Sequence, residues 1–442
     1  MNVESFVELF RVKISSFYGK EIDKSDIFVT VDDAVEFQYK KTFEQHLNVK
    51  VFCQLRLQKN TELIKHTWNH LNEDEIDKEI KLSLAKLKDA KNHVWEDIIT
   101  REVELKDSIQ HDHSDSMQIV VSNEVKLNKL QKLVQFIEKQ RDSNFYLKNV
   151  LYKEVKRSEY IWSHGMNHFQ KHISTNYQIN ITFYCDSVVD SLYNQYTRFH
   201  EIEWKQIALD VLRRKTILNL PRIDFSAKKV DAIFDSSIMV EFLKSLCAHF
   251  LGRKILLQKS LFFKKIRKSI FAKKINIFDN PFINHTFGKR FIDHEGVGTQ
   301  RVNVIKNGVF SAIAFDQKSA AAYGAESTGH AKWNPTNGNA QSFHNFLIEP
   351  GRKDDQQLLQ VVKDGPYLMG VENLNLDKDT LEFKGLFYGA YIQNGKAISS
   401  FKGLELKSDV TELLKNVSAL GNKLKWKTHF ASPHVYVKEL DL

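Results

Sequence analysis

The chain has 442 residues, about three times the usual domain length of roughly 150 residues, so its length predicts two or three domains with sizeable cores. Apolar residues make up 42% and charged residues 27%, close to the averages of soluble globular proteins, which excludes a disordered or low-complexity scaffold. Apolar runs of about 18 residues are missing, and charges interrupt the apolar positions of the N-terminus. The sequence therefore predicts a soluble, cytoplasmic protein with no membrane association.

The three cysteines of the chain, Cys53, Cys185 and Cys247, lie far apart and form no CxxC pair. Neither a disulfide framework nor a zinc site made of thiolates is indicated by this spacing. We expect the three side chains to be buried as small apolar groups in a reducing compartment.

Strands and helices alternate in the first half of the sequence. Residues 49–57 alternate between apolar and polar side chains, which predicts a strand with one buried face. Residues 76–87 have apolar positions at helical spacing after an acidic first turn, and residues 127–137 show the same spacing. The polar stretch 107–116 is predicted to be an exposed loop, and residues 178–184 a strand. This order is typical of an α+β layer.

Turn signals dominate the second half. Asn307-Gly308 and Asn394-Gly395 each stand between two apolar runs, and both dipeptides accept the positive φ values of tight hairpin turns, so two antiparallel hairpins are predicted. Asp409 and Glu412 form a capping-box pattern that predicts a helix over 413–420, ended by Gly421. We place the boundary near Pro221, with domains at 1–220 and 221–442.

A basic segment, residues 252–274, holds nine Lys and Arg residues and no acidic residue, while the net charge of the whole chain is +9. Lysines interleaved with Phe262, Phe263 and Phe271 could track a phosphate backbone. The favoured interpretation is a half-buried segment with solvated lysines, because no nucleic-acid-binding motif accompanies it. Nucleic acid is therefore an unlikely partner.

No complete active site can be assembled from the residues themselves. Asp293, His294 and Glu295 could support acid-base chemistry, but in the strand predicted for them adjacent side chains would alternate between faces. Ser327 lacks the GxSxG pattern of a nucleophilic serine, and no glycine-rich phosphate loop is present.

An ordered series of motifs in the second half resembles the TldD/PmbA family, which is described as modulators of DNA gyrase and as zinc metallopeptidases that trim or degrade unfolded peptides. The motifs are IFDNP at 277–281, FIDHEGVGTQRVNVIKNG at 291–308, ESTGHA at 326–331, NFLIEPG at 345–351, Gly421-Asn422 and Ser432-Pro433. The resemblance covers roughly 230–442 well. Gly298 and His330 stand where the family usually has Pro and Asn, which indicates a divergent member.

The resemblance implies a β-rich C-terminal TldD/PmbA domain with antiparallel hairpins after a strand-helix N-terminal domain. It also marks candidates for peptide or subunit contact within the densest motifs. These candidates are Asp293, Glu295, Gly296, Thr299, Arg301, Asn307, Gly308, Ser327, Thr328 and Gly329.

The family contains two kinds of subunit, and the TldD type carries a zinc-binding HExxxH motif. Aligned with that motif, this chain has Lys244, Ser245 and His249, so only the last histidine is kept. A lysine is protonated at neutral pH and binds zinc poorly, and a serine cannot replace the glutamate as general base. The tail KTHFASPHVYV also lacks the C-terminal cysteine ligand and follows the PmbA (TldE) type. The resemblance therefore implies no catalytic residues and no metal in this chain.

The function implied by the resemblance is that of a PmbA/TldE-like subunit, non-catalytic itself, in a TldD/TldE-type metallopeptidase that processes or matures unfolded peptides. Zinc would belong to a TldD-type partner, so whether this chain is an enzyme stays open. The alternative is a stand-alone homodimeric protein that binds peptides or acts as a scaffold without proteolysis.

Overall fold

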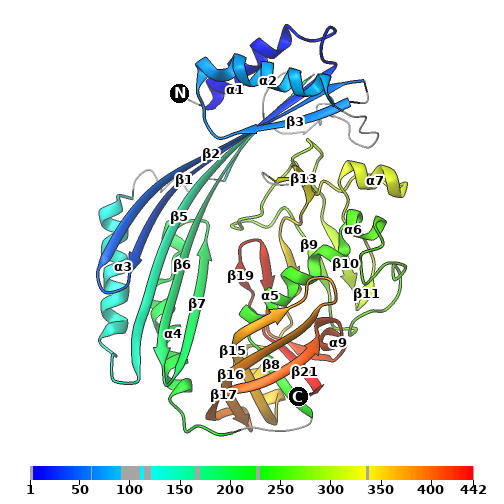
Figure 1. Cartoon of the computed structure of the whole chain (residues 1–442). Coiled ribbons are helices and arrows are strands. Elements are labelled where there is room, and N and C mark those ends of the chain that lie inside the picture. The colour runs from blue at the N-terminus through cyan, green and yellow to red at the C-terminus, as the bar shows by residue number, and fades with distance from the viewer. Residues whose placement is uncertain are drawn as a thin grey trace.

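The computed structural model consists of a long curved sheet from the first half of the chain and a shorter β-rich half beside it (Figure 1). It describes residues 3–60, 62–90, 110–113, 121–164, 170–224, 229–334 and 338–441. None of the described helices combines the length and the apolar character needed to cross a membrane.

The first half is built on one seven-stranded sheet with the strand order β3-β2-β1-β5-β6-β4, in which β7 also pairs with β6. The pairs are antiparallel except for β4 with β6. The strands are β1 (Lys24–Tyr39), β2 (Phe43–Lys59), β3 (Glu62–Trp68), β4 (Gln110–His113), β5 (Phe145–Ser163), β6 (Gln170–Cys185) and β7 (Val188–Tyr196).

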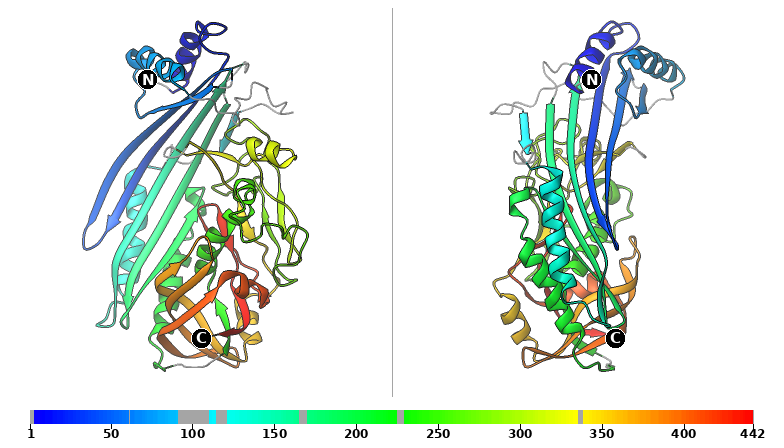
Figure 2. Two further views of the ribbon diagram at one scale, coloured as in Figure 1. Left: turned by 45° about the vertical axis from the view of Figure 1, so that its right-hand side comes forward. Right: turned by 90° about the vertical axis from the view of Figure 1, so that its left-hand side faces the viewer.

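Four helices cover this sheet in two pairs (Figure 2). At one end, α1 (Val3–Ser15) and α2 (Ile76–Lys88) enclose a core that includes Phe10 and Leu55. At the other end, α3 (Asn123–Glu138) and α4 (Trp204–Leu218) pack side by side over a second core. The predicted helices at 76–87 and 127–137 and the predicted strands at 49–57 and 178–184 are thereby confirmed.

The second half contains two six-stranded sheets and one hairpin. The first sheet has the order β17-β16-β15-β8-β21-β18, and the second β11-β10-β9-β14-β20-β19, while β12 pairs with β13. Their bounds are β8 (Lys229–Phe234), β9 (Ile277–Asp279), β10 (Val302–Lys306), β11 (Val309–Phe310), β12 (Ala331–Asn334), β13 (Gly338–Gln341), β14 (Phe346–Ile348), β15 (Asp364–Leu376), β16 (Glu382–Gln393), β17 (Lys396–Asp409), β18 (Val417–Leu420), β19 (Lys425–Lys427), β20 (Phe430–Ser432) and β21 (Val435–Asp441).

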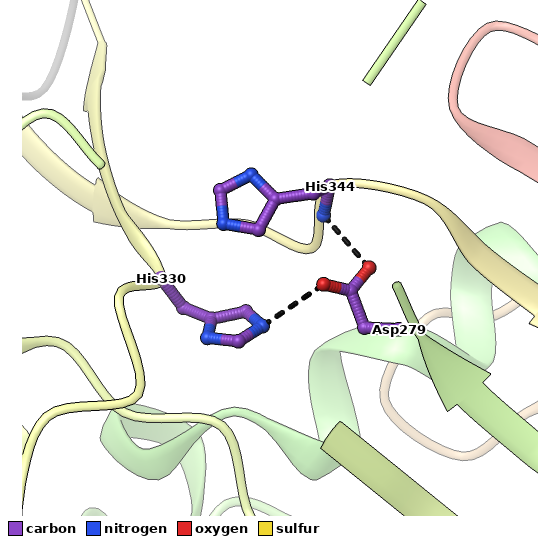
Figure 3. A group of neighbouring side chains, drawn as sticks. All are labelled: Asp279, His330 and His344. Carbon is purple, nitrogen blue, oxygen red and sulfur yellow. Dashed lines mark hydrogen bonds and ion pairs between the residues drawn. The ribbon is translucent and has the colours of Figure 1, made fainter. Parts of the chain in front are cut away.

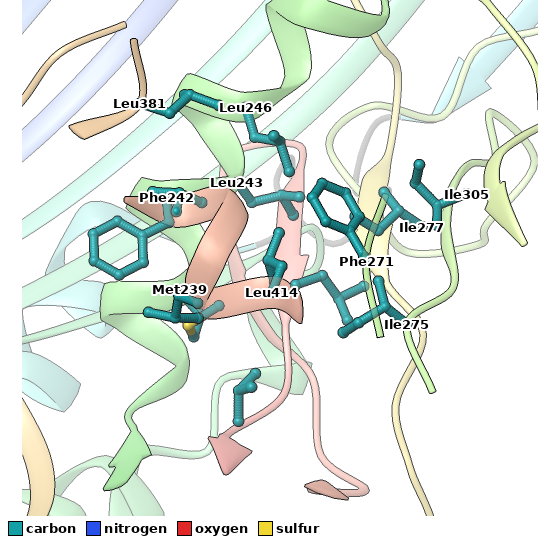
Figure 4. Packing of buried hydrophobic residues seen from close by; sticks show 14 of the residues in the cluster. Met239, Phe242, Leu243, Leu246, Phe271, Ile275, Ile277, Ile305, Leu381 and Leu414 are labelled. Carbon is teal, nitrogen blue, oxygen red and sulfur yellow. The ribbon is translucent and has the colours of Figure 1, made fainter. Parts of the chain in front are cut away.

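Helix α5 (Ser236–Cys247) lies in the main core of this half (Figure 4). Its apolar residues Met239, Phe242, Leu243 and Leu246 are all buried at helical spacing, which explains why this segment is helical. The remaining helices are α6 (Gly252–Leu256), α7 (Gln317–Tyr323), α8 (Asp355–Val361) and α9 (Val410–Lys415). The mixed helix and strand content confirms the predicted α+β class.

The two halves are joined by a buried ionic network around Arg214 of α4. Its guanidinium contacts Asp190 of β7 at 2.8 Å and Asp235, the residue before α5, at 2.9 Å. The hydroxyl groups of Tyr388 and Tyr367 donate to the same two carboxylates, each at 2.8 Å. We call these five residues the Arg214 network.

Both predicted Asn-Gly hairpins are confirmed, with φ values of 50° and 76° at Asn307 and Gly308 and nearly the same values at Asn394 and Gly395. The solvated-lysine interpretation of the basic segment also agrees with the structure, since Phe262 and Phe271 are buried in the core while most of its lysines are exposed.

Three local predictions are wrong. Residues 110–113 form β4 instead of a loop. Pairing with β6 at a sheet edge uses main-chain groups, so the strand needs no apolar pattern. The rest of 107–116 lies outside the described residues. The helix predicted over 413–420 ends at Lys415, and Val417–Leu420 pair with β21 as β18. Residues 293–295 form a turn, not a strand. In β2, moreover, both faces are buried over 53–58, because Arg56 pairs with Asp26.

Candidate functional site

The position of the zinc-binding motif falls on the last turns of α5. Asp235 caps the helix by accepting the amide hydrogen of Ser237, and the apolar face described above fixes its rotation. Lys244 lies on the opposite side of the helix and donates to Glu241 at 3.1 Å. Burial raises the pKa of the Cys247 thiol to about 12, and this thiol donates to the Lys244 carbonyl, so Cys247 stays protonated.

His249 is completely buried in the short 3₁₀ turn that follows α5. Its Nδ1 accepts the main-chain amide hydrogen of Leu261 at 3.0 Å, and its Nε2 lies 3.0 Å from the carbonyl oxygen of Lys378. Burial lowers the pKa of the imidazole. A neutral ring with Nε2 protonated satisfies both contacts, so the one histidine kept from the motif serves as a hydrogen-bonding bridge between loops.

The IFDNP and ESTGHA motifs meet in a buried cluster of Asp279, His330 and His344 (Figure 3). Asp279 Oδ1 accepts the amide hydrogens of His344 and Asn345, each at 2.8 Å, and Oδ2 lies 3.1 Å from His330 Nε2. The ring of His344 points away from the carboxylate and its Nε2 contacts the Gly329 carbonyl.

These three side chains have the chemistry of a metal site, since one ligand atom of each lies within 4.8 Å of the others. Both oxygens of Asp279 and the facing nitrogen of His330 are nevertheless engaged with each other or with main-chain groups. A metal ion would have to replace those hydrogen bonds. The cluster is therefore better explained as a junction that holds three motif segments together.

Asp293 holds a second junction, in the DHEG motif. It is fully buried, and Oδ1 accepts the amide hydrogens of Glu295 and Val297, each at 2.9 Å, while Oδ2 accepts that of Ala331 at 3.0 Å. Asp293 and Asp279 together fix the segment from His330 to Ala331 at the start of β12. We call these two aspartates and His330 the motif junction.

Most of the other residues marked by the family resemblance also make contacts inside the chain. Glu295 accepts from the Gln317 amide, Thr299 and Ser327 donate to carbonyl groups, and Thr328 Oγ1 accepts from the Phe315 amide. Gly296, Gly308 and Gly329 adopt positive φ values at turns, with Asn307 beside Gly308. Arg301 stacks over Phe278 at 4.4 Å. Contact of this set with a peptide or subunit stays a prediction.

A cavity of about 70 Å³ lies directly beside the motif junction, between strands β5 and β6 of the first half and loops of the second half. We call it the interdomain cavity. Four basic residues line it, Arg157, Lys289, Arg290 and Lys332, with one acidic residue, Glu159. The rest of its polar lining consists of four histidines and two serines, namely His172, His294, His344, His429, Ser174 and Ser342.

The position of each wall follows from contacts already described. Ala331, held by Asp293, precedes Lys332, and the amide of His344 is held by Asp279. Thr428, next to His429, exchanges two hydrogen bonds with Gln195 of β7, at 2.6 and 3.0 Å. Sequence reasoning missed Lys332 and His429, because neither belongs to a periodic pattern; the adjacent ESTGHA motif was the only signal for Lys332.

A second cavity, of about 520 Å³, lies around the Arg214 network. Its charged lining is balanced, with four basic residues, Arg213, Arg214, Lys423 and Lys425, facing four acidic ones, Glu203, Asp210, Asp235 and Asp355. The interdomain cavity is thus the one of the two with a clear excess of positive charge.

The family described as the PmbA/TldA metallopeptidase C-terminal domain matches residues 227–442. A metalloprotease of Methanocaldococcus jannaschii is 25% identical over 194 residues, 43% of each chain. A PmbA metalloprotease homologue of Haemophilus influenzae is 21% identical over 286 residues, 63% of this chain and 61% of that one. The matched part spans about half the length of these curated relatives.

Solved structures share the fold of nearly the whole chain. TldE from Thermococcus kodakarensis has a TM-score of 0.84 and 17% identity, with 100% of this chain and 98% of the other covered. A protein described as a modulator of a DNA gyrase from Thermotoga maritima has a TM-score of 0.84 and 16% identity, with both chains fully covered. The resemblance to the TldD/PmbA family is confirmed, and residues 227–442 belong to the PmbA/TldA metallopeptidase C-terminal domain family.

Proposed function

We propose that this chain is a non-catalytic, peptide-binding subunit of a TldD/TldE-type metallopeptidase, in which a TldD-type partner supplies the zinc. The observation that carries the proposal is the state of His249. Both of its ring nitrogens are engaged with main-chain groups inside a fully buried site, so it has no nitrogen free for a metal ion.

The other two motif positions support the same proposal. Lys244 is a cation held by Glu241, and Ser245 is a buried hydroxyl without the basicity needed to activate water. Within the described part of the chain, none of the groups of three potential metal ligands includes a residue of α5. A catalytic zinc at this helix would have to come with ligands from elsewhere.

The partner in this proposal is a second member of the same family, of the TldD type. Relatives of this chain include a protein from Buchnera aphidicola named as a TldD metalloprotease homologue, which is 26% identical over 175 residues. The fold of this chain, in contrast, is shared with a TldE. Exposed sheet edges can bind an extended peptide through main-chain hydrogen bonds without reading its sequence, which suits unfolded peptides as substrates.

The proposal is tested by metal content and by reconstitution. The purified chain, dialysed against metal-free buffer, is expected to hold less than stoichiometric zinc and to leave unfolded casein intact. Addition of a TldD-type protein from the same organism should produce a heterodimer and chelator-sensitive cleavage. Stoichiometric zinc together with cleavage by the chain alone would refute the proposal.

Two variants locate the chemistry within the mixture. Replacing the glutamate of the partner's HExxxH motif should abolish cleavage, whereas His249→Gln in this chain should leave it nearly unchanged, because glutamine can keep one donor and one acceptor at that position. Peptide binding by a homodimer, with no activity in any mixture, would instead favour the stand-alone scaffold.

A further inference from the structure

The interdomain cavity is a pre-formed polar site to which the proposed function assigns no role. Its walls come from two strands of the first half and from motif loops of the second half, and the motif junction fixes two of them. Lys332 is exposed to solvent, so a ligand can reach the cavity from outside. Its volume of about 70 Å³ matches a small chemical group rather than a whole folded partner.

The charges of the lining are not balanced by the chain. Arg157 is paired with Asp32, both guanidinium contacts measuring 2.7 Å, and Arg290 is paired with Glu159, the acidic residue of the lining. Among the residues that the structure describes, the Lys332 side chain has no hydrogen-bond or ion-pair partner, and Lys289 has no acidic one. The Lys289 ammonium donates to the neutral Asn284 and lies 5.4 Å from the centre of the Phe291 ring. Although the Lys332 side chain reaches solvent, desolvation of its ammonium group by the cavity wall and repulsion from Arg290 and Arg157 lower the pKa of Lys332 to about 8.

Two histidines of the cavity are neutral, and one of them, His429, offers a hydrogen-bond donor, whereas the N–H of the other, His344, is donated to the Gly329 carbonyl. Burial lowers the pKa of His344 to about 4 and that of His429 to about 3, so both rings are uncharged at neutral pH. A neutral imidazole presents one N–H group and one acceptor nitrogen. The main-chain carbonyl of His429 accepts from the Phe346 amide, but its imidazole ring has no hydrogen-bond partner among the described residues, so the ring N–H is available to a ligand.

Other ligand classes fit less well. A metal cation would be repelled by the excess of positive charge, and the carboxylate nearest to His344 is already engaged in the motif junction. A nucleic-acid backbone needs an extended basic surface and cannot enter a cavity of this size. An oxyanion would supply the missing negative charge and could accept hydrogen bonds from both Lys332 and His429.

We propose that the interdomain cavity binds a carboxylate of a peptide, with Lys332 as the charged donor and His429 as a neutral one. This inference rests on the proposed function, because the peptide is its substrate class. A peptide that places one carboxylate in the interdomain cavity would be anchored there without recognition of its other side chains. Asp279 and Asp293 are positioning residues for this site, since they hold His344 and Ala331 in place.

The test compares three short peptides made of Ala, Gln and Ser that carry the same uncharged fluorescent label. One has a free C-terminal carboxylate, one has a C-terminal amide, and one has the amide and a single internal Glu. Binding to the full chain is measured by fluorescence anisotropy. At least one carboxylate-bearing peptide should bind about tenfold more tightly than the neutral amide, equivalent to about 1.4 kcal/mol.

Variants assign this difference to the cavity. Lys332→Gln should remove most of the preference for the carboxylate, and His429→Ala should reduce it, whereas Lys306→Gln, an exposed lysine on β10, should preserve it. Circular dichroism and thermal melting confirm that each variant is folded. Inorganic phosphate should compete with the carboxylate-bearing peptide and not with the neutral amide.

The outcomes separate this inference from the proposed function. Equal binding of all three peptides would support a peptide-binding subunit and overturn the carboxylate site. A preference that survives Lys332→Gln would also overturn it, and so would phosphate binding at the cavity without any carboxylate preference. Failure of every peptide to bind would overturn both.

Discussion

The two polar regions that join the halves of this chain differ in how completely their charges are matched. In the Arg214 network, one guanidinium faces two carboxylates, and each carboxylate also accepts a tyrosine hydroxyl. In the interdomain cavity, basic residues outnumber acidic ones, and Lys332 has no acidic partner in the described chain. A matched network stabilises an interface, whereas unmatched charge in a cavity costs free energy unless a ligand supplies the opposite sign.

The motif junction stands between these two cases. It belongs to the wall of the cavity, but its hydrogen bonds are made inside the chain, as in the Arg214 network. Motif residues of this kind act on a site by fixing its main chain. Variants should therefore separate into those that unfold the protein and those that only weaken ligand binding.

The largest effect is expected from breaking the Arg214 network. Arg214→Met leaves Asp190 and Asp235 buried without their cation, and removal of one partner from a buried ion pair typically costs about 3–5 kcal/mol of unfolding free energy. Chemical denaturation followed by circular dichroism measures this loss. Arg222→Met removes a half-exposed ion pair with Asp186 and should cost below about 1 kcal/mol. Equal losses in the two variants would contradict the distinction between buried and exposed pairs.

A smaller loss is expected at the motif junction. In Asp279→Asn the amide oxygen can still accept the two main-chain hydrogens, but the charge facing His330 is gone, so we expect a loss of about 1–3 kcal/mol. Asp279→Ala removes both acceptors and should lose more. A zinc titration of the wild type provides the control for the metal alternative, because stoichiometric binding abolished by Asp279→Asn would show that the cluster is a metal site after all.

These contrasts also explain which parts of the fold and of the candidate site could be predicted from the sequence. Periodicity located α2 and α3, because burial of one helix face leaves a regular pattern in the residue order. It also located residues 49–57 of β2 through their alternating residue types, although both faces are buried over 53–58. It failed at β4 and at β18, whose pairing depends on partners far away in the chain. Asp293 and Glu295 were recognised through the family motif. Their internal hydrogen bonds could not be foreseen, because these depend on how three loops pack together.

Lys332 and His429 show the same limit for the cavity. They lie 97 positions apart in the chain and become neighbours of one cavity only when β12 and the loop before β20 meet at the first-half sheet. No local pattern marks such residues. What distinguishes them is that, among the residues the structure describes, the Lys332 ammonium and the His429 ring have no hydrogen-bond partner.

A moderate effect on the free energy of unfolding is expected at acidic pH, where His344 of the cavity becomes protonated. Because the folded pKa of His344, about 4, is below the value of about 6.5 in unfolded chains, the unfolded state binds more protons between these pH values. The contribution of His344 to the free energy of unfolding is therefore fully present above about pH 6.5. It is lost as the pH falls towards 4, by up to about 1.4 kcal/mol per pH unit. Urea denaturation at several pH values should show a shallower dependence in His344→Gln. His46→Gln, at an exposed histidine, should leave the slope unchanged.

The smallest effect on stability is expected at Lys332, and this result would sharpen the comparison most. Lys332→Gln removes an exposed cation that has no acidic partner among the described residues and that is repelled by Arg290 and Arg157. The unfolding free energy should therefore change by no more than about 0.5 kcal/mol. Lys126→Gln is the contrasting variant, because Lys126 is buried against Glu154 at 2.8 Å and the substitution removes this buried ion pair. Denaturation curves of both variants, measured under the same conditions, give the two losses of unfolding free energy. A loss at Lys332 as large as at Lys126 would mean that Lys332 is bound within the fold, and the unmatched charge on which the cavity argument depends would not exist.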